Sequence, residues 1–122
     1  MVQTIAFMIT LYGISNCDTV KKARAWLGEL GVAHAFHDFK KQGVPEAALD
    51  VWLAAMGWEA LVNRKGTTWR SLDEVTRVAV VGAASARVVL LARPGLIKRP
   101  VVRWTDGAVT VGFDAANWQR RV

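Results

Sequence analysis

The spacing of hydrophobic residues near the start of the chain changes at one short turn. Ile9-Thr10-Leu11-Tyr12 is an apolar run, which predicts a short buried strand. Beyond the turn the spacing is helical, which predicts a helix over residues 18–30 that ends at Gly31, a residue suited to the position after a helix. Residues 32–39 alternate imperfectly and predict a second strand. Strand, helix and strand at this spacing form a βαβ unit, so we expect the two strands to be parallel. The expected apolar face of the helix holds Val20, Ala23, Leu27 and Leu30.

The middle of the chain, residues 45–92, predicts a block of helices. Pro45 is expected near the first position of a helix that continues to about Met56. A short helix should follow at residues 58–61, and then a polar, glycine-containing loop at residues 63–70. Ser71 resembles the N-cap of a helix to about residue 81, and residues 83–92 predict another helix, ended by Pro94-Gly95.

The end of the chain predicts a hairpin and a last helix. Residues 101–104 and 109–113 are expected to be strands, joined at Asp106-Gly107, a dipeptide typical of tight hairpin turns. Asp114 is suited to cap a helix that runs to about Arg121. The order β-α-β, helical block, β-hairpin, α indicates an α/β protein with a thioredoxin-like fold. We expect one domain over residues 1–122, with a helical insertion at about 45–92.

Composition limits the chemistry. The chain has 122 residues, one cysteine, two histidines and a net charge of +6. One cysteine excludes an intramolecular disulfide, and with so few soft ligands we expect no zinc site and no bound cofactor. We expect anionic partners, and we expect the six tryptophans mainly in the core or at its rim. No signal peptide or membrane span is expected, which predicts a cytoplasmic protein, and residues 1–7 should be a loosely attached extension.

The single cysteine, Cys17, falls between the first strand and the first helix. The exposed amides and positive dipole end at a helix start favour an anion, and a thiolate is an anion. A cysteine placed there often has a lowered pKa and a raised nucleophilicity. Val20 occupies the place of a resolving cysteine in a Cys-x-x-Cys motif, so any oxidised form of Cys17 needs a thiol from another molecule. The alternative at this point is that Cys17 is a small buried hydrophobe.

Four segments together resemble the ArsC/Spx family, which includes glutaredoxin-coupled arsenate reductases, and most closely its YffB-type reductases. The resemblance covers the chain from Met8 to its end, in order and with compatible spacing. The segments are Leu11-Tyr12-Gly13-Ile14-Ser15-Asn16-Cys17-Asp18-Thr19-Val20-Lys21-Lys22-Ala23-Arg24, Arg64-Lys65-Gly66-Thr67-Thr68-Trp69-Arg70, Ile97-Lys98-Arg99-Pro100 and Val111-Gly112-Phe113.

The resemblance implies a role for each of several residues. Cys17 should be the nucleophile, and Arg99, before a cis Pro100, should face the cysteine loop. Arg64 matches a second arginine that helps to bind an oxyanion, since a tetrahedral oxyanion suits guanidinium groups. Lys21 and Thr19 are further candidates for binding the anion. Asn16 and Pro100 are expected to shape the site.

At three places the sequence differs from the arsenate reductases, and these differences bear on which substrate the resemblance implies. Gly13 stands where they carry a histidine before the cysteine, and Gly112 stands where they carry a third arginine. Asp18-Thr19-Val20-Lys21 replaces their Gly-Thr-Ser-Arg run, so that Asp18 adds a negative charge beside the thiol. These departures weaken the case for arsenate and fit the YffB-type branch, which is thought to include glutathione-dependent thiol reductases.

The resulting hypothesis is a cytoplasmic, monomeric reductase with one nucleophilic cysteine. Its substrate would be a small oxyanion or a glutathionylated or oxidised thiol, and glutathione, with glutaredoxin to complete the cycle, would resolve the Cys17 adduct. The alternative is a non-catalytic, Spx-like regulator that binds RNA polymerase, although Val20 removes the redox switch typical of that branch. Direct nucleic-acid binding comes third, because the basic residues are scattered.

Overall fold

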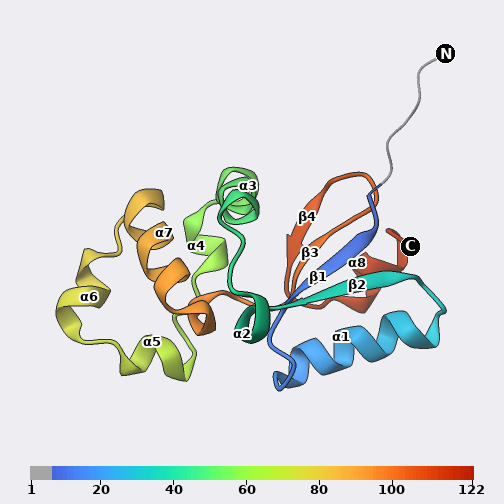
Figure 1. Ribbon diagram of the computed structural model, residues 1–122, viewed down its shortest axis with the longest axis horizontal. Coiled ribbons are helices and arrows are strands. Elements are labelled where there is room, and N and C mark those ends of the chain that lie inside the picture. Colours follow the sequence, from blue (N-terminus) through green and yellow to red (C-terminus); the bar gives the residue numbers. More distant parts are fainter. Residues whose placement is uncertain (1–6) are drawn as a thin grey trace, which may run out of the picture. The chain divides into compact units, whose positions relative to one another are not determined.

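The computed structural model describes residues 7–122 (Figure 1). Its contacts divide the chain into two compact units. The first unit consists of the described part of Met1–Asp38 together with Arg99–Val122, and the second unit is Phe39–Lys98. The first unit contains β1 (Ile9–Gly13), α1 (Asp18–Glu29), β2 (His34–Asp38), β3 (Val101–Arg103), β4 (Val109–Val111) and α8 (Ala115–Gln119). The second unit contains α2 (Phe39–Gln42), α3 (Glu46–Met56), α4 (Trp58–Leu61), α5 (Thr67–Ser71), α6 (Glu74–Ala79), α7 (Ala83–Ala92) and the 3₁₀ turn η1 (Pro94–Leu96).

The first unit is built on a four-stranded sheet with the order β2-β1-β3-β4. β1 and β2 are parallel, and Leu11 pairs with Phe36 across them. β3 is antiparallel to both β1 and β4, with Leu11 opposite Val102. The parallel βαβ unit and the hairpin are therefore confirmed, and with α1 and α8 they form the thioredoxin-like fold expected from the sequence.

α1 and α8 cover one face of this sheet, where the core of the first unit lies (Figure 1). Trp118 of α8 lies at the centre of this core and is 1% exposed. Its ring makes edge contacts with Trp104 at 5.0 Å and Phe113 at 4.7 Å between centroids, a geometry that aromatic pairs favour. The buried core residues are Ile9, Leu11, Ala23, Leu27, Val102, Trp104 and Trp118. The tryptophans at positions 52, 104 and 118 are buried, which confirms their assignment to packing.

α1 ends where the sequence predicts, but its last apolar position differs. The Gly31 N–H donates to the Gly28 carbonyl at 3.1 Å, and the Val32 N–H donates to the Leu27 carbonyl at 3.0 Å. Gly31 has a φ of +68°, and the two bonds form the Schellman motif that closes a helix. Leu30 is the C-cap and is 48% exposed, so its expected place on the buried face was wrong.

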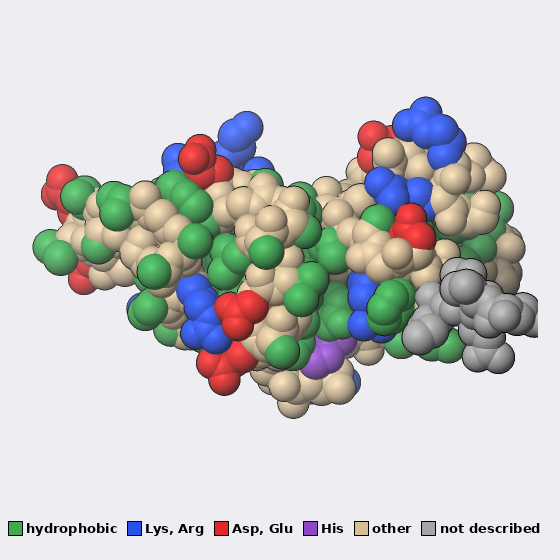
Figure 2. Space-filling model, turned by 90° about the horizontal axis from the view of Figure 1, so that it is seen from above, with side chains coloured by type: hydrophobic (Ala, Val, Ile, Leu, Met, Phe, Trp, Pro, Cys, Tyr) green, Lys and Arg blue, Asp and Glu red, His purple; other side chains and the backbone are tan. Residues whose placement is uncertain are grey.

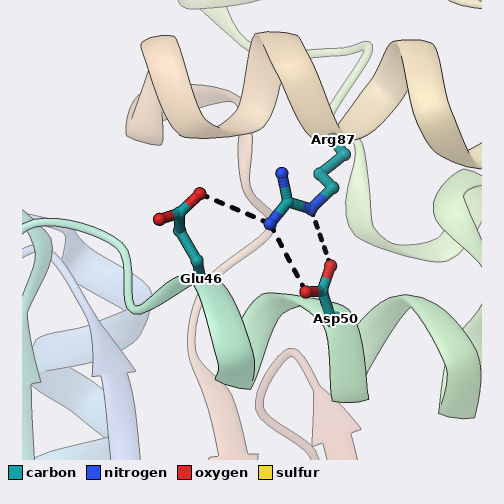
Figure 3. Close-up of polar contacts among 3 residues, drawn as sticks. All are labelled: Glu46, Asp50 and Arg87. Carbon is teal, nitrogen blue, oxygen red and sulfur yellow. Dashed lines mark hydrogen bonds and ion pairs between the residues drawn. The ribbon is translucent and has the colours of Figure 1, made fainter.

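In the second unit, α3 and α7 are linked by one arginine (Figure 3). Arg87 Nε donates to Asp50 Oδ1 at 2.7 Å, and its Nη2 lies 3.4 Å from Glu46 Oε1. The bond from Arg87 holds the pKa of Asp50 below its ordinary value and raises that of Arg87. Because these groups are exposed to water, the link orients the two helices more than it stabilises them.

Three boundaries predicted between residues 38 and 74 were wrong. The second strand stops at Asp38, and Phe39 begins α2 and packs its ring against Trp52 at 6.2 Å. The predicted loop at 63–70 contains the start of α5. The Ser71 hydroxyl donates to the Thr68 carbonyl of α5, so it caps no following helix. Asp73 takes that place, since its Oδ1 accepts from the Thr76 N–H at 2.8 Å and α6 starts at Glu74.

The expected loose extension at residues 1–7 is described only at its last residue, because residues 1–6 lie outside the described part of the chain. The Phe7 N–H donates to the Thr105 carbonyl at 2.8 Å. The Arg103 guanidinium lies 4.7 Å from the centroid of the Phe7 ring. Phe7 is therefore attached to the β3–β4 hairpin, and the prediction was wrong for this residue.

The aromatic core predicts a large cost for truncating Trp118. Trp118→Ala should lower the free energy of unfolding by about 3–5 kcal/mol, because it leaves a cavity among the rings of Trp26, Trp104 and Phe113. Chemical denaturation followed by circular dichroism would measure this, and Trp118→Phe, which keeps a ring, should cost less. Val78→Ala is the control, since Val78 is 69% exposed and should change stability by less than about 0.5 kcal/mol. Equal effects of the Trp118 and Val78 changes would contradict this account of the core.

Candidate active site

Cys17 occupies the N-cap of α1, immediately after the turn that follows β1. The Cys17 N–H donates to the Ile14 carbonyl at 3.1 Å, which closes the turn. The Cys17 carbonyl accepts from the Lys21 N–H at 2.9 Å, which begins the helix. Both bonds fix the backbone on either side of the thiol, which is half-buried and not disulfide-bonded.

The environment of Cys17 favours its thiolate. Burial raises the pKa of the Cys17 thiol, but the backbone N–H of Val20, the Arg99 guanidinium and the backbone N–H of Thr19 lower it by more. The net pKa lies below the ordinary value of a cysteine. Thr19 and Val20 are the second and third residues of the helix, whose N–H groups have no partner within the helix. The thiol makes no cap hydrogen bond of its own, but it lies close enough to these N–H groups for them to favour its thiolate.

Arg99 reaches the thiol through the pairing of strands that are distant in sequence. Tyr12 near the end of β1 is opposite Val101 at the start of β3. Arg99 precedes Val101 by two residues, so the antiparallel register carries it past the end of β1, where the cysteine turn begins. The Arg99–Pro100 peptide bond is cis, and the carbonyl of the buried Pro100 accepts from the Gly112 N–H at 2.9 Å. The Arg99 guanidinium lies close enough to the Cys17 thiol to lower its pKa, so it faces the cysteine loop.

The other predicted site residues have different surroundings. Asn16 is exposed in the turn, and Thr19 offers its backbone N–H to the thiol. Lys21 is exposed and bonds Cys17 through its backbone; its ammonium group is not among the groups that shift the pKa of Cys17. Asp18 is also absent from those groups, so its expected opposition to the thiolate has no visible counterpart. Arg64 belongs to the second unit, where its guanidinium lies 5.0 Å from the Trp58 ring centroid.

The backbone N–H of Val20 was missed by the sequence reasoning, which treated Val20 only as the residue that replaces a second cysteine. The capping rule contains the necessary information, because the N–H of the third helical residue commonly bonds the N-cap side chain. Once Cys17 is placed at the N-cap, the contribution of Val20 follows.

Gly13 stands where the resemblance to the arsenate reductases places a histidine, and the space beside Gly13 is already filled. A Cβ atom at position 13 would lie 2.8 Å from Val20 Cγ2, and Val20 is fully buried beneath the start of α1. A side chain at position 13 therefore requires Val20 to move. Glycine at 13 and valine at 20 fit each other, and this pairing gives a packing reason for the missing histidine.

Three general features of residues 7–122 bear on metal, membrane and nucleic-acid binding. No group of three or more His, Cys, Asp or Glu side chains in that range is arranged to hold a metal ion. No helix there has the length and apolar character needed to cross a membrane. Within each unit, the Lys and Arg side chains on the face drawn in Figure 2 lie in separate groups, some beside Asp or Glu.

The fold and this site together define a thioredoxin-like protein whose single cysteine sits at a helix start beside an arginine that precedes a cis-proline. The sequence matches the ArsC family over residues 12–121, so the chain belongs to the ArsC family.

Relatives of known sequence or structure agree with this membership. A Haemophilus influenzae protein is 42% identical over 112 residues, which is 92% of this chain and 96% of its own length. The solved structure of a YffB protein is 44% identical with a TM-score of 0.88, and the match covers 93% of this chain and 98% of that one. The solution structure of an arsenate reductase (ArsC) related protein from Brucella melitensis is 48% identical with a TM-score of 0.72, with 93% of each chain covered.

The contribution of Arg99 predicts a shift in the reactivity of Cys17. Because only the thiolate is alkylated, the rate of iodoacetamide modification follows the ionisation of the thiol. In Arg99→Gln the pKa should rise, so the midpoint of the rate-against-pH curve should move to higher pH. Lys21→Gln is the matched control, since its charge is not among those that shift the pKa of the thiol, and it should leave the midpoint in place. An unchanged midpoint in Arg99→Gln would contradict the assignment.

The contact between Gly13 and Val20 predicts coupled effects on stability. Gly13→Ala should lower the free energy of unfolding by about 1–3 kcal/mol, because it overpacks a closed site. When Val20→Ala is already present, the same change should cost less. A double-mutant cycle measured by chemical denaturation tests this, and strict additivity of the two changes would show that the contact is not the cause.

Proposed function

We propose that this protein is a thiol-dependent reductase in which Cys17 forms a covalent adduct that glutathione resolves. One observation supports the proposal above all others: the half-buried thiol is flanked by the N–H groups of Thr19 and Val20 and by Arg99, which together lower its pKa. The lowered pKa leaves more of the nucleophilic thiolate at a given pH, and it also makes Cys17 a better leaving group in the second step.

The reaction takes two exchanges. The Cys17 thiolate attacks the glutathione sulfur of a glutathionylated thiol R–S–S–G, the S–S bond breaks, and R–S⁻ leaves and takes a proton. This yields Cys17–S–S–G. The thiolate of a second glutathione then attacks the glutathione sulfur of this adduct, which releases the Cys17 thiolate and oxidised glutathione. The sum is R–S–S–G plus one glutathione giving R–SH plus oxidised glutathione, and glutaredoxin could serve in the second step.

The sequence itself supports an external resolving thiol. Cys17 is the only cysteine of the chain, so no second thiol of the same molecule is available to form a disulfide. The proposal places the protein in the cytoplasm, where glutathione keeps thiols reduced. Arg99 has two tasks in this scheme: it stabilises the thiolate, and it attracts the anionic substrate. Lys21 is proposed as a further cation that attracts it.

Two glycines favour an oxidised thiol over arsenate as the substrate. Position 13 has no room for the histidine of the arsenate reductases beside Val20. Gly112 has a φ of +84°, a backbone region that an arginine adopts only under strain. The third arginine and the histidine that suit an oxyanion are therefore both absent, and both positions are shaped for glycine.

The decisive experiment compares substrates with the wild-type protein and Cys17→Ser. With glutathione present, the wild type should reduce a glutathionylated peptide faster than it reduces arsenate, and Cys17→Ser should fall to the uncatalysed rate. Without the second glutathione, mass spectrometry should find the wild type carrying one glutathione in disulfide linkage. Arg99→Gln should slow the first exchange most at low pH, where the raised thiol pKa leaves less thiolate.

The outcomes separate the alternatives. Activity that survives in Cys17→Ser would overturn the proposal. Reduction of arsenate with no reduction of the peptide would keep the nucleophile but change the substrate class.

A further inference from the structure

The second unit contains a small pocket with mixed charge. Its volume is about 250 Å³, and Val62 forms a buried apolar part of its wall. The remaining lining residues are Glu59, Arg64, Lys65 and Lys98. Three cations and one carboxylate therefore surround a space larger than a single small ion needs.

Paired backbone segments bring these residues together. Val62 and Ile97 form an antiparallel bridge. The Asn63 N–H donates to the Leu96 carbonyl at 2.7 Å, and the Lys98 N–H donates to the Leu61 carbonyl at 2.8 Å. Leu61, Val62, Leu96 and Ile97 are at most 1% exposed. Lys98 thus stands on a backbone anchored to that of residues 61–63.

The loop that carries Arg64 and Lys65 is also fixed. The Lys65 N–H donates to Asn63 Oδ1 at 3.1 Å, and the Lys65 carbonyl accepts from Arg70 Nη1 at 2.7 Å. A Cβ atom at Gly66 would lie 2.8 Å from Asn63 Nδ2, so the loop is tightly folded. The Arg64 guanidinium lies over the Trp58 ring, which limits its freedom.

The charges of the pocket are not used in ion pairs among residues 7–122. The salt bridges found there join Arg87 to Glu46 and Asp50. Within the same residues, Glu59 forms no ion pair with Arg64, Lys65 or Lys98. An oxyanion alone would satisfy the cations but would be repelled by Glu59. A ligand with a carboxylate and an ammonium group on one carbon would satisfy both signs.

We propose that this pocket binds the zwitterionic end group of an α-amino acid. Arg64, Lys65 and Lys98 would hold the carboxylate, Glu59 would accept from the ammonium group, and Val62 would contact the aliphatic carbons. Both a free amino acid and the γ-glutamyl end of glutathione carry this group. The inference goes beyond the proposed function, because it needs no chemistry at Cys17.

Binding to the full-length Cys17→Ser protein tests this without any thiol exchange. In titrations followed by amide chemical shifts, S-methylglutathione should perturb residues 59–66 and 96–98. L-glutamate should do the same if free amino acids suffice, whereas a response to S-methylglutathione alone would identify the peptide as the source. Glutarate, which lacks the ammonium group, should bind at least about tenfold more weakly than L-glutamate or S-methylglutathione, whichever binds.

Charge variants complete the test. Lys98→Gln and Glu59→Gln should each weaken the binding of L-glutamate or S-methylglutathione, whichever binds, about tenfold. The matched control is Lys22→Gln, which changes an exposed lysine of α1 in the first unit and should leave the affinity unchanged. If Glu59→Gln strengthens binding and inorganic phosphate perturbs the same residues as strongly, the pocket is a simple anion site and the proposal is wrong. Absence of any perturbation at residues 59–66 and 96–98 would also overturn it.

Discussion

The site depends on the antiparallel pairing of β1 with β3. β1 ends at the cysteine turn, and β3 begins just after Arg99, so the register of Tyr12 with Val101 brings a guanidinium to a thiol that is far away in sequence. The buried packing of α1 and α8 on one face of the sheet fixes that register, since a shift by one residue would turn Leu11 and Val102 out of the core. Stability and thiol chemistry therefore rest on the same strand pair.

The backbone amides at the start of α1 also lower the pKa of Cys17, in addition to Arg99. Two amides that the helix leaves without partners, those of Thr19 and Val20, lower the pKa of the Cys17 thiol, although the thiol makes no cap hydrogen bond. Val20 contributes one of these amides, while its side chain fills the space beside Gly13. One residue thus links the ionisation of the nucleophile to the close packing that leaves no room for a side chain at position 13. The groups that lower the thiol pKa are therefore held by the helix start and the paired strands that also form the fold.

Local sequence predicted most elements and several of their ends. The end of α1 at Gly31, the cap of α8 by Asp114 and the hairpin at Asp106-Gly107 depend on residues close together in the chain, and each was found as expected. The failures arose where neighbouring groups competed. Ser71 and Asp73 both suit an N-cap, and the serine was already engaged by the Thr68 carbonyl. Phe39 lies in α2 and not in β2, and its ring packs against Trp52, a contact that no local sequence pattern indicates.

The sequence alone determined the single cysteine, its place between a strand and a helix, and the need for a thiol from another molecule, because these follow from residue identity and short-range periodicity. The family motifs also pointed to Arg99 and to a cis Pro100. Only the tertiary structure decided that the Arg99 charge and the amides of Thr19 and Val20 outweigh the burial of Cys17, since that balance depends on distances across paired strands. It also decided that Lys98 shares a pocket with Arg64, because a backbone bridge between distant segments joins them.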